Sequence, residues 1–212
     1  MLLRNTAIEL AGDGGFSHRG DWSVGALLIK PDAIEAEQVG FIRDIVKEKL
    51  APVGGKIALE LSMVDLSQEE VRIIYPTLQE EVLEDVERYL ASGPCIGMLV
   101  DAPLSIGSLM RRVIGMKGPR LGDRSTERLL EGRITNGTIR DLLPLPGDEE
   151  MYQSIIPSLV RRRNNPTIRR ADPRYAFTDE QYFYYSRNLA HSPDNREELD
   201  GLFDVIVKRT TS

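Results

Sequence analysis

The class of fold is indicated most clearly by the segment Trp22-Ser23-Val24-Gly25-Ala26-Leu27-Leu28-Ile29-Lys30-Pro31-Asp32. Its first eight residues form a short apolar run, which is typical of a buried strand, and Pro31 ends the strand because it lacks a backbone donor. Apolar residues then recur at helical spacing, at Ile34, Val39, Ile42, Ile45 and Val46. This spacing predicts an amphipathic helix over residues 35–50.

The segments that follow alternate between strands and helices. Residues 56–64 alternate in polarity after a Gly-Gly turn, and residues 95–100 are apolar after Gly-Pro, so both are predicted strands. The patterns Ser67-Gln68-Glu69-Glu70 and Thr77-Leu78-Gln79-Glu80 are capping boxes, which predict that two helices begin there. With a further predicted helix over residues 105–114, this order indicates an α/β sandwich.

The remaining segments are less regular. Residues 1–21 are glycine-rich and polar and are expected to form a flexible arm, and residues 22–212 are expected to form a single domain. The elements predicted in its second half are a surface loop over 115–136, a charged helix over 149–162, a strand in the aromatic run 182–185, a helix over 195–203, and a final short strand or ordered tail over 205–207.

Composition narrows the class of protein. A chain of 212 residues that is 41% hydrophobic can bury a sizeable core, and its net charge of −6 argues against bulk binding of nucleic acid. No apolar run is long enough to span a bilayer, and no secretory signal is evident, so a cytoplasmic location is expected. Cys95 is a single cysteine in an apolar run and is expected to be a buried thiol.

His191 is one of only two histidines, and it stands in the run Asn188-Leu189-Ala190-His191-Ser192. Cations occur far upstream of it at Lys30, in the pair Arg111-Arg112, and at Arg140. A neutral imidazole can attack phosphorus, and fixed cations stabilise charge on the equatorial oxygens. This set of residues therefore favours phosphoryl transfer.

With these motifs in view, the chain resembles the nucleoside diphosphate kinase family over roughly residues 22–140 and 184–204. Four blocks occur in the order of the family: Leu28-Ile29-Lys30-Pro31-Asp32; Ser92-Gly93-Pro94 before an apolar strand; Arg111-Arg112-Val113-Ile114-Gly115 with Gly137-Thr138-Ile139-Arg140; and Asn188-Leu189-Ala190-His191-Ser192. Each block is weakly specific by itself, and the signal lies in their order.

The resemblance implies a fold and a reaction. The fold is a ferredoxin-like βαββαβ sandwich with helices packed on an antiparallel sheet, assembled into homo-oligomers through dimers. The reaction moves the γ-phosphoryl of ATP or another nucleoside triphosphate to a nucleoside diphosphate through a phosphohistidine. Mg²⁺ arrives on the nucleotide phosphates, with little direct ligation by side chains.

Carried over residue by residue, His191 matches the phosphorylated nucleophile, and Lys30 matches the lysine that contacts the terminal phosphate. Arg140 matches one of two arginines that grip the nucleotide phosphates, a task that suits the bidentate guanidinium. Arg111 keeps the family spacing for the other, whereas Arg112 keeps the Arg-Val pair, so both are candidates with Arg111 favoured.

Three further positions match contacts around the nucleotide. Asn188 matches the asparagine that bonds the sugar hydroxyl, although an asparagine before a turn is often only a local hydrogen-bonding residue. Tyr75 matches the tyrosine that orients the histidine region, with core packing an equally good account. Val82 or Leu83 stands where the family stacks the base on phenylalanine, which could lower base affinity by about 1 kcal/mol or more.

Other departures concern the groups around the phosphate and the imidazole. Lys117 or Gly118 replaces a phosphate-contacting threonine. The glutamate that holds the histidine ring in the family falls on Leu202 in an ungapped alignment. Glu197, Glu198 or Asp200 could replace it only if the helix shifts. These losses give a second hypothesis, a nucleotide-binding scaffold of the same fold with weakened or no turnover.

Two segments are longer than the family pattern, near residues 118–136 and 141–187. Loops of this size inside a compact domain are uncommon unless they serve a function or are disordered, so a lid or partner surface is one interpretation. The arginine-rich run 161–170 could meet phosphates, an acidic partner or nucleic acid, but the net acidity makes nucleic acid the weakest of these hypotheses.

Overall fold

The structure is a computed structural model that describes residues 22–78, 80–103, 189–193 and 195–211, with single positions at 110, 113, 139, 154, 157, 158, 161, 178 and 187. Residues 110 and 113 are helical, as predicted for 105–114, and so are 154, 157, 158 and 161, as predicted for 149–162. The predicted arm, the loop over 115–136, the strand over 182–185 and most of the two long segments lie outside the described residues.

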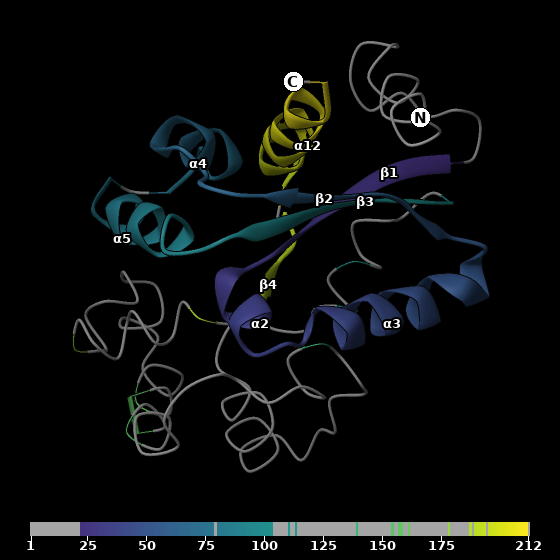
Figure 1. The fold of residues 1–212 in the computed structure, drawn as a ribbon, viewed down its shortest axis with the longest axis horizontal. Coiled ribbons are helices and arrows are strands. Elements are labelled where there is room, and N and C mark those ends of the chain that lie inside the picture. The colour runs from purple at the N-terminus through teal and green to yellow at the C-terminus, as the bar shows by residue number, and fades with distance from the viewer. Residues whose placement is uncertain are drawn as a thin grey trace.

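The described residues form a four-stranded antiparallel sheet in the order β2-β3-β1-β4 (Figure 1). The strands are β1 (Trp22–Ile29), β2 (Lys56–Met63), β3 (Cys95–Pro103) and β4 (Ala190–His191). The two central strands bury both faces, which explains why Leu27, Leu28 and Ile29 are all apolar and fully buried. The first three strands occur where the sequence predicts them.

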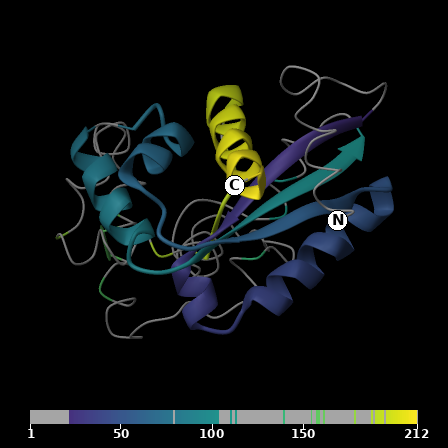
Figure 2. The ribbon, with the colours of Figure 1, turned by 45° about the horizontal axis from the view of Figure 1, so that its top comes forward.

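Helices cover both faces of the sheet (Figure 1). On one face lie α4 (Gln68–Ile74), α5 (Glu80–Leu90) and α12 (Arg196–Thr211), which share one buried cluster with alternate residues of β1 and β2. On the other face lie α2 (Pro31–Glu35), α3 (Val39–Leu50) and the short 3-10 helix Ala51–Val53, and α3 packs in a second cluster. Figure 2 shows α12 running across the first face and α3 beneath the second.

The predicted helix over 35–50 is wrong in its first part. The chain forms two helices, α2 and α3, separated by residues 36–38. Pro31 starts the first helix, since its fixed φ suits the first helical turn. Glu37 then has φ 56, a left-handed conformation that an α-helix cannot contain. The apolar positions that predict a single helix are therefore divided between two separate helices.

Two further predictions are settled by the helices of the first face. The capping box at Ser67 and Glu70 is confirmed with both of its reciprocal hydrogen bonds. A second helix does begin nearby, at Glu80, but the predicted capping box at Thr77 is wrong: Thr77 lies three residues before the helix, and its hydroxyl donates to Oε1 of Glu198.

The predicted strand or tail over 205–207 is wrong, because α12 continues to Thr211. Val205 and Ile206 are buried against the sheet, so tertiary packing overrides the strand preference of β-branched residues.

Glycine allows α12 to lie close to its neighbours. A Cβ at Gly201 would sit 2.0 Å from the backbone oxygen of Ile73 in α4. A Cβ at Gly97 in β3 would sit 2.5 Å from Cγ1 of Ile206. The first contact sets the spacing between α12 and α4, and the second sets the spacing between α12 and the sheet. Within the part of the chain that is described, none of the helices combines the length and apolar character needed to cross a membrane.

Candidate functional site

His191 lies on β4, the short strand at one edge of the sheet. It pairs with Leu28 of β1, and its side chain is buried, with 7% of the residue exposed. The imidazole packs against Tyr75, with ring centroids 4.5 Å apart and planes inclined by 44°. Tyr75 follows the last turn of α4 and is itself buried in the first core cluster. Tyr75 therefore both fills the core and contacts the histidine, so the two accounts given for it do not exclude each other.

Lys30 follows the last residue of β1 and lies beside β4, which is called the histidine strand below because it carries His191. Its backbone N–H donates to the carbonyl of Leu189 at 2.9 Å, which extends the pairing between β1 and β4. Its ammonium lies 5.5 Å from the centroid of the Tyr89 ring, a cation–π arrangement. Because Tyr75 and Tyr89 belong to the same core cluster, Lys30 and His191 project from the same face of the sheet.

Glu198 supplies the acidic group beside the imidazole. Its Oε2 lies 3.7 Å from Nε2 of His191, within the range of an ion pair, and both side chains are less than a tenth exposed. Its Oε1 accepts from the Asn195 amide and from the Thr77 hydroxyl, each at 3.3 Å. These donors turn the carboxylate so that its other oxygen faces the ring.

Sequence matching placed the family glutamate on Leu202, which is a fully buried core residue. Glu198 stands one helical turn earlier, in the first turn of α12. The signal that could have selected it is the N-cap pattern Asn195-x-x-Glu198, because the Asn195 side chain accepts from the Glu198 backbone N–H at 2.9 Å. That pattern fixes where α12 begins and therefore which carboxylate comes nearest to β4.

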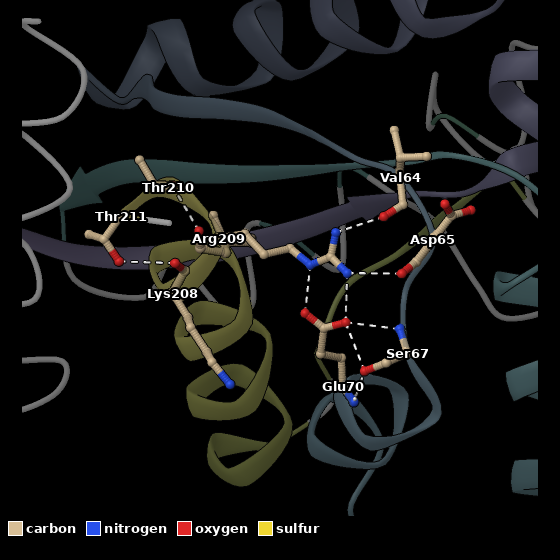
Figure 3. A network of polar contacts seen from close by, with 9 residues as sticks. Val64, Asp65, Ser67, Glu70, Lys208, Arg209, Thr210 and Thr211 are labelled. Carbon is tan, nitrogen blue, oxygen red and sulfur yellow. Dashed lines mark hydrogen bonds and ion pairs between the residues drawn. The ribbon is translucent and has the colours of Figure 1, made fainter.

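The other end of α12 is also anchored (Figure 3). The Arg209 guanidinium donates to both carboxylate oxygens of Glu70, at 2.5 and 2.6 Å, and to the carbonyls of Val64 and Asp65. Hydrogen bonds from Arg209 and from Ser67 lower the pKa of Glu70 to about 2. The helix that carries Glu198 is thus held at its start by Asn195 and Thr77 and at its end by Arg209.

Asp32 is a part of the site to which sequence reasoning assigned no role. It is 1% exposed, and its Oδ2 accepts from the Leu189 backbone N–H at 2.8 Å. Its Oδ1 accepts a short hydrogen bond from the Tyr89 hydroxyl. Burial, together with the nearby Asp32 charge, raises the pKa of Tyr89 far above its ordinary value, so the phenol stays protonated as a donor. In the sequence, the only feature that points to Asp32 is its position in the Lys-Pro-Asp block.

The structure does not place every predicted residue. Arg111, Arg112, Arg140 and Asn188 lie outside the described residues, so their roles stay predictions. Residues beside the three arginines do pack with the histidine strand: Met110, Val113 and Ile139 share the second core cluster with Leu189 and Ala190.

The two candidates for the base contact, Val82 and Leu83, are both buried, and Leu83 belongs to the first core cluster. A base contact at Leu83 therefore stays a prediction. Among the described residues, no group of three or more His, Cys, Asp and Glu side chains could hold a metal ion. Mg²⁺ carried by the nucleotide is likewise a prediction.

Comparison with known proteins identifies the fold. No family model and no curated protein matches the sequence. A transition-state mimic of nucleoside-diphosphate kinase from Borrelia burgdorferi, with bound vanadate and ADP, has a TM-score of 0.52 and 14% identity, covering 88% of this chain and 86% of that chain. The nucleoside diphosphate kinase of Aquifex aeolicus has a TM-score of 0.51 and 17% identity, covering 87% and 94%. The predicted ferredoxin-like sandwich is thus confirmed, and the chain has a fold like that of nucleoside diphosphate kinases.

Proposed function

We propose that the protein is a phosphotransferase that moves the γ-phosphoryl of a nucleoside triphosphate, such as ATP, to a nucleoside diphosphate through a phosphohistidine at His191. The observation that carries the proposal is the buried pair of His191 and Glu198, with Lys30 projecting from the same face of the sheet. The fold shared with nucleoside diphosphate kinases supports the same class of reaction.

The contact with Glu198 assigns different roles to the two ring nitrogens. A carboxylate facing Nε2 favours the tautomer in which Nε2 carries the proton, so the lone pair remains on Nδ1. Nδ1 then attacks the γ-phosphorus, a P–N bond forms, and the bond to the bridging oxygen breaks, releasing the nucleoside diphosphate. The acceptor diphosphate reverses these steps with its terminal oxygen. Glu198 stabilises the positive charge that the ring carries when Nδ1 is phosphorylated.

The cations act on the phosphate oxygens. We assign to Lys30 and Arg140, with either Arg111 or Arg112, the stabilisation of charge on the transferring group, and to Asn188 the sugar contact. Mg²⁺ enters with the nucleotide and neutralises its phosphates. Support for this role of Lys30 comes from its backbone hydrogen bond to Leu189, two residues before His191.

A second function is favoured by the burial of the site. His191 and Lys30 are each less than a tenth exposed, and Leu83 packs in the core. A protein that binds nucleotide through the same fold but does not transfer phosphoryl groups fits these observations too. Calorimetry would select this reading if it detected binding of ADP or ATP to a protein that takes no label.

The test is to incubate the protein with γ-labelled ATP and Mg²⁺ and to measure acid-labile label on the chain. We expect label on the wild type, none on His191→Ala, and about 10- to 100-fold slower labelling of Glu198→Gln. Glu197→Gln is the matched control, because Glu197 is the exposed neighbour of Glu198 in the same helical turn. Label that persists in His191→Ala, or equal effects of the two glutamine variants, would contradict the assignment.

Assembly and location extend the same proposal. We expect a homo-oligomer, which light scattering of the purified protein can measure. A cytoplasmic location stays a prediction from the sequence, to be checked by fractionation.

A further inference from the structure

The Lys30-Pro31-Asp32 block holds the backbone of Leu189 from both sides. The Lys30 N–H donates to the Leu189 carbonyl at 2.9 Å, and the Asp32 carboxylate accepts from the Leu189 N–H at 2.8 Å. The contact with Asp32 joins residues that lie 157 positions apart in the chain. Leu189 stands immediately before β4 and two residues before His191.

Leu189 needs this support because of its conformation. Its φ is 68°, in the left-handed region, which costs a residue with a branched side chain roughly 1–2 kcal/mol. The turn directs the Leu189 side chain into the second core cluster, whereas the His191 ring contacts Tyr75 in the first cluster. In a regular strand, residues two positions apart point to the same side, so the left-handed conformation of Leu189 accompanies the change of side between Leu189 and His191.

The Asp32 carboxylate is itself fixed by a second element. The Tyr89 hydroxyl, from the last turns of α5, donates to Oδ1, while Oδ2 accepts from Leu189. A carboxylate that is 1% exposed is costly to bury unless such donors satisfy it. The face of the Tyr89 ring also carries the Lys30 ammonium at 5.5 Å. Tyr89 therefore contacts both the Asp32 carboxylate, which accepts from Leu189, and the Lys30 ammonium.

We propose that Asp32 is a positioning residue for His191, acting through the Leu189 backbone and oriented by the Tyr89 hydroxyl. The inference rests on the proposed phosphotransferase function. Asp32 touches neither the nucleotide nor the imidazole in this scheme. It holds the left-handed turn that aims the ring at the phosphate, so its loss lowers the rate of phosphoryl transfer without removing the nucleophile.

Two variants and one control test the proposal. Asp32→Asn keeps an acceptor for the Leu189 N–H but removes the charge, and Tyr89→Phe removes the donor while keeping the ring beneath Lys30. Glu87→Gln is the control, because Glu87 is a buried carboxylate two residues before Tyr89 in α5 that pairs with Arg72 instead. The readings are hydrogen exchange at the Leu189 amide, the ¹⁵N shifts of the His191 ring, and the rate of labelling at saturating ATP.

For Asp32→Asn we expect faster exchange at Leu189, ring shifts that move away from a single Nε2–H tautomer, and labelling slowed about tenfold. Tyr89→Phe should change all three in the same direction by less, and Glu87→Gln should leave them at wild-type values. If Asp32→Asn does not fold, Tyr89→Phe carries the test.

The proposal is overturned if the folded variants keep the wild-type ring shifts, or if exchange at Leu189 accelerates while the ring does not respond. The ring spectrum needs no nucleotide and only two histidines contribute to it, so it decides the positioning role even if the wild type takes no label. In that case the phosphotransferase function fails separately.

Discussion

Gly201→Ala should be strongly destabilising, although alanine is the better helix former. A Cβ at this position lies 2.0 Å from the Ile73 carbonyl oxygen, whereas an ordinary contact between carbon and oxygen is about 3.3 Å. The helices α12 and α4 would have to separate by about 1.3 Å, and backbone cannot rotate away as a side chain can. Overpacking of this kind costs about 3 kcal/mol, against a gain of about 1 kcal/mol in helix propensity, so we expect a net loss of about 2 kcal/mol.

Gly40→Ala is the matched comparison. Gly40 lies in α3, is exposed, and has no atom within 4 Å of the Cβ position. The same substitution should therefore stabilise the protein by about 0.5–1 kcal/mol. Urea unfolding of both variants gives the two free energies. Equal stabilisation by the two substitutions would refute the reasoning, since it would mean that α12 is free to move from α4.

Other consequences can be measured on single variants. Since the pKa of Glu70 is lowered to about 2, its contribution to stability is full above about pH 4.5 and is lost as the pH falls toward 2. The shift from 4.5 sets an upper limit of about 3 kcal/mol, and partial solvation reduces the expected value to about 1–2 kcal/mol. Arg209→Met should lower the free energy of unfolding by that amount at pH 7. In urea unfolding at a series of pH values, the variant should therefore lose less stability than the wild type as the pH falls, and an equal loss would contradict the prediction. Ser67→Ala should cost about 1 kcal/mol in the same assay, because it removes the N-cap of α4. Thr77→Val should slow labelling of the histidine about tenfold, with Thr77→Ser close to wild type, because the hydroxyl orients Glu198, and equal rates for the two would exclude that role.

The sheet could be predicted from the sequence because its long strands are apolar runs bounded by proline and glycine. The strand Trp22–Ile29 and the capping box at Ser67 depend on local patterns, and both occur as expected. The histidine strand could not be found in this way. It has two residues, too few to show an alternating pattern of polar and apolar side chains. It forms because the edge of β1 is available for pairing.

The candidate site was predictable as a set of residue types but not as an arrangement. His191 and Lys30 stand out by their chemistry, and the structure brings them to one face. The carboxylates of Glu198 and Asp32 do not stand out among 33 acidic residues. Their roles depend on the line along which α12 crosses the sheet and on a left-handed turn at Leu189, and both of these are tertiary features.

The order of the strands also has a consequence for synthesis on the ribosome. The strand β1 can pair with β3 as soon as residue 103 has emerged, but β4 and α12 are made only after a long intervening segment. Until α12 is released, the apolar face that it covers is open to other nascent chains, which favours aggregation. Chaperone capture should therefore be strongest after β3 has emerged and before α12 has emerged, and the histidine should become reactive only once β4 and α12 have packed on the sheet.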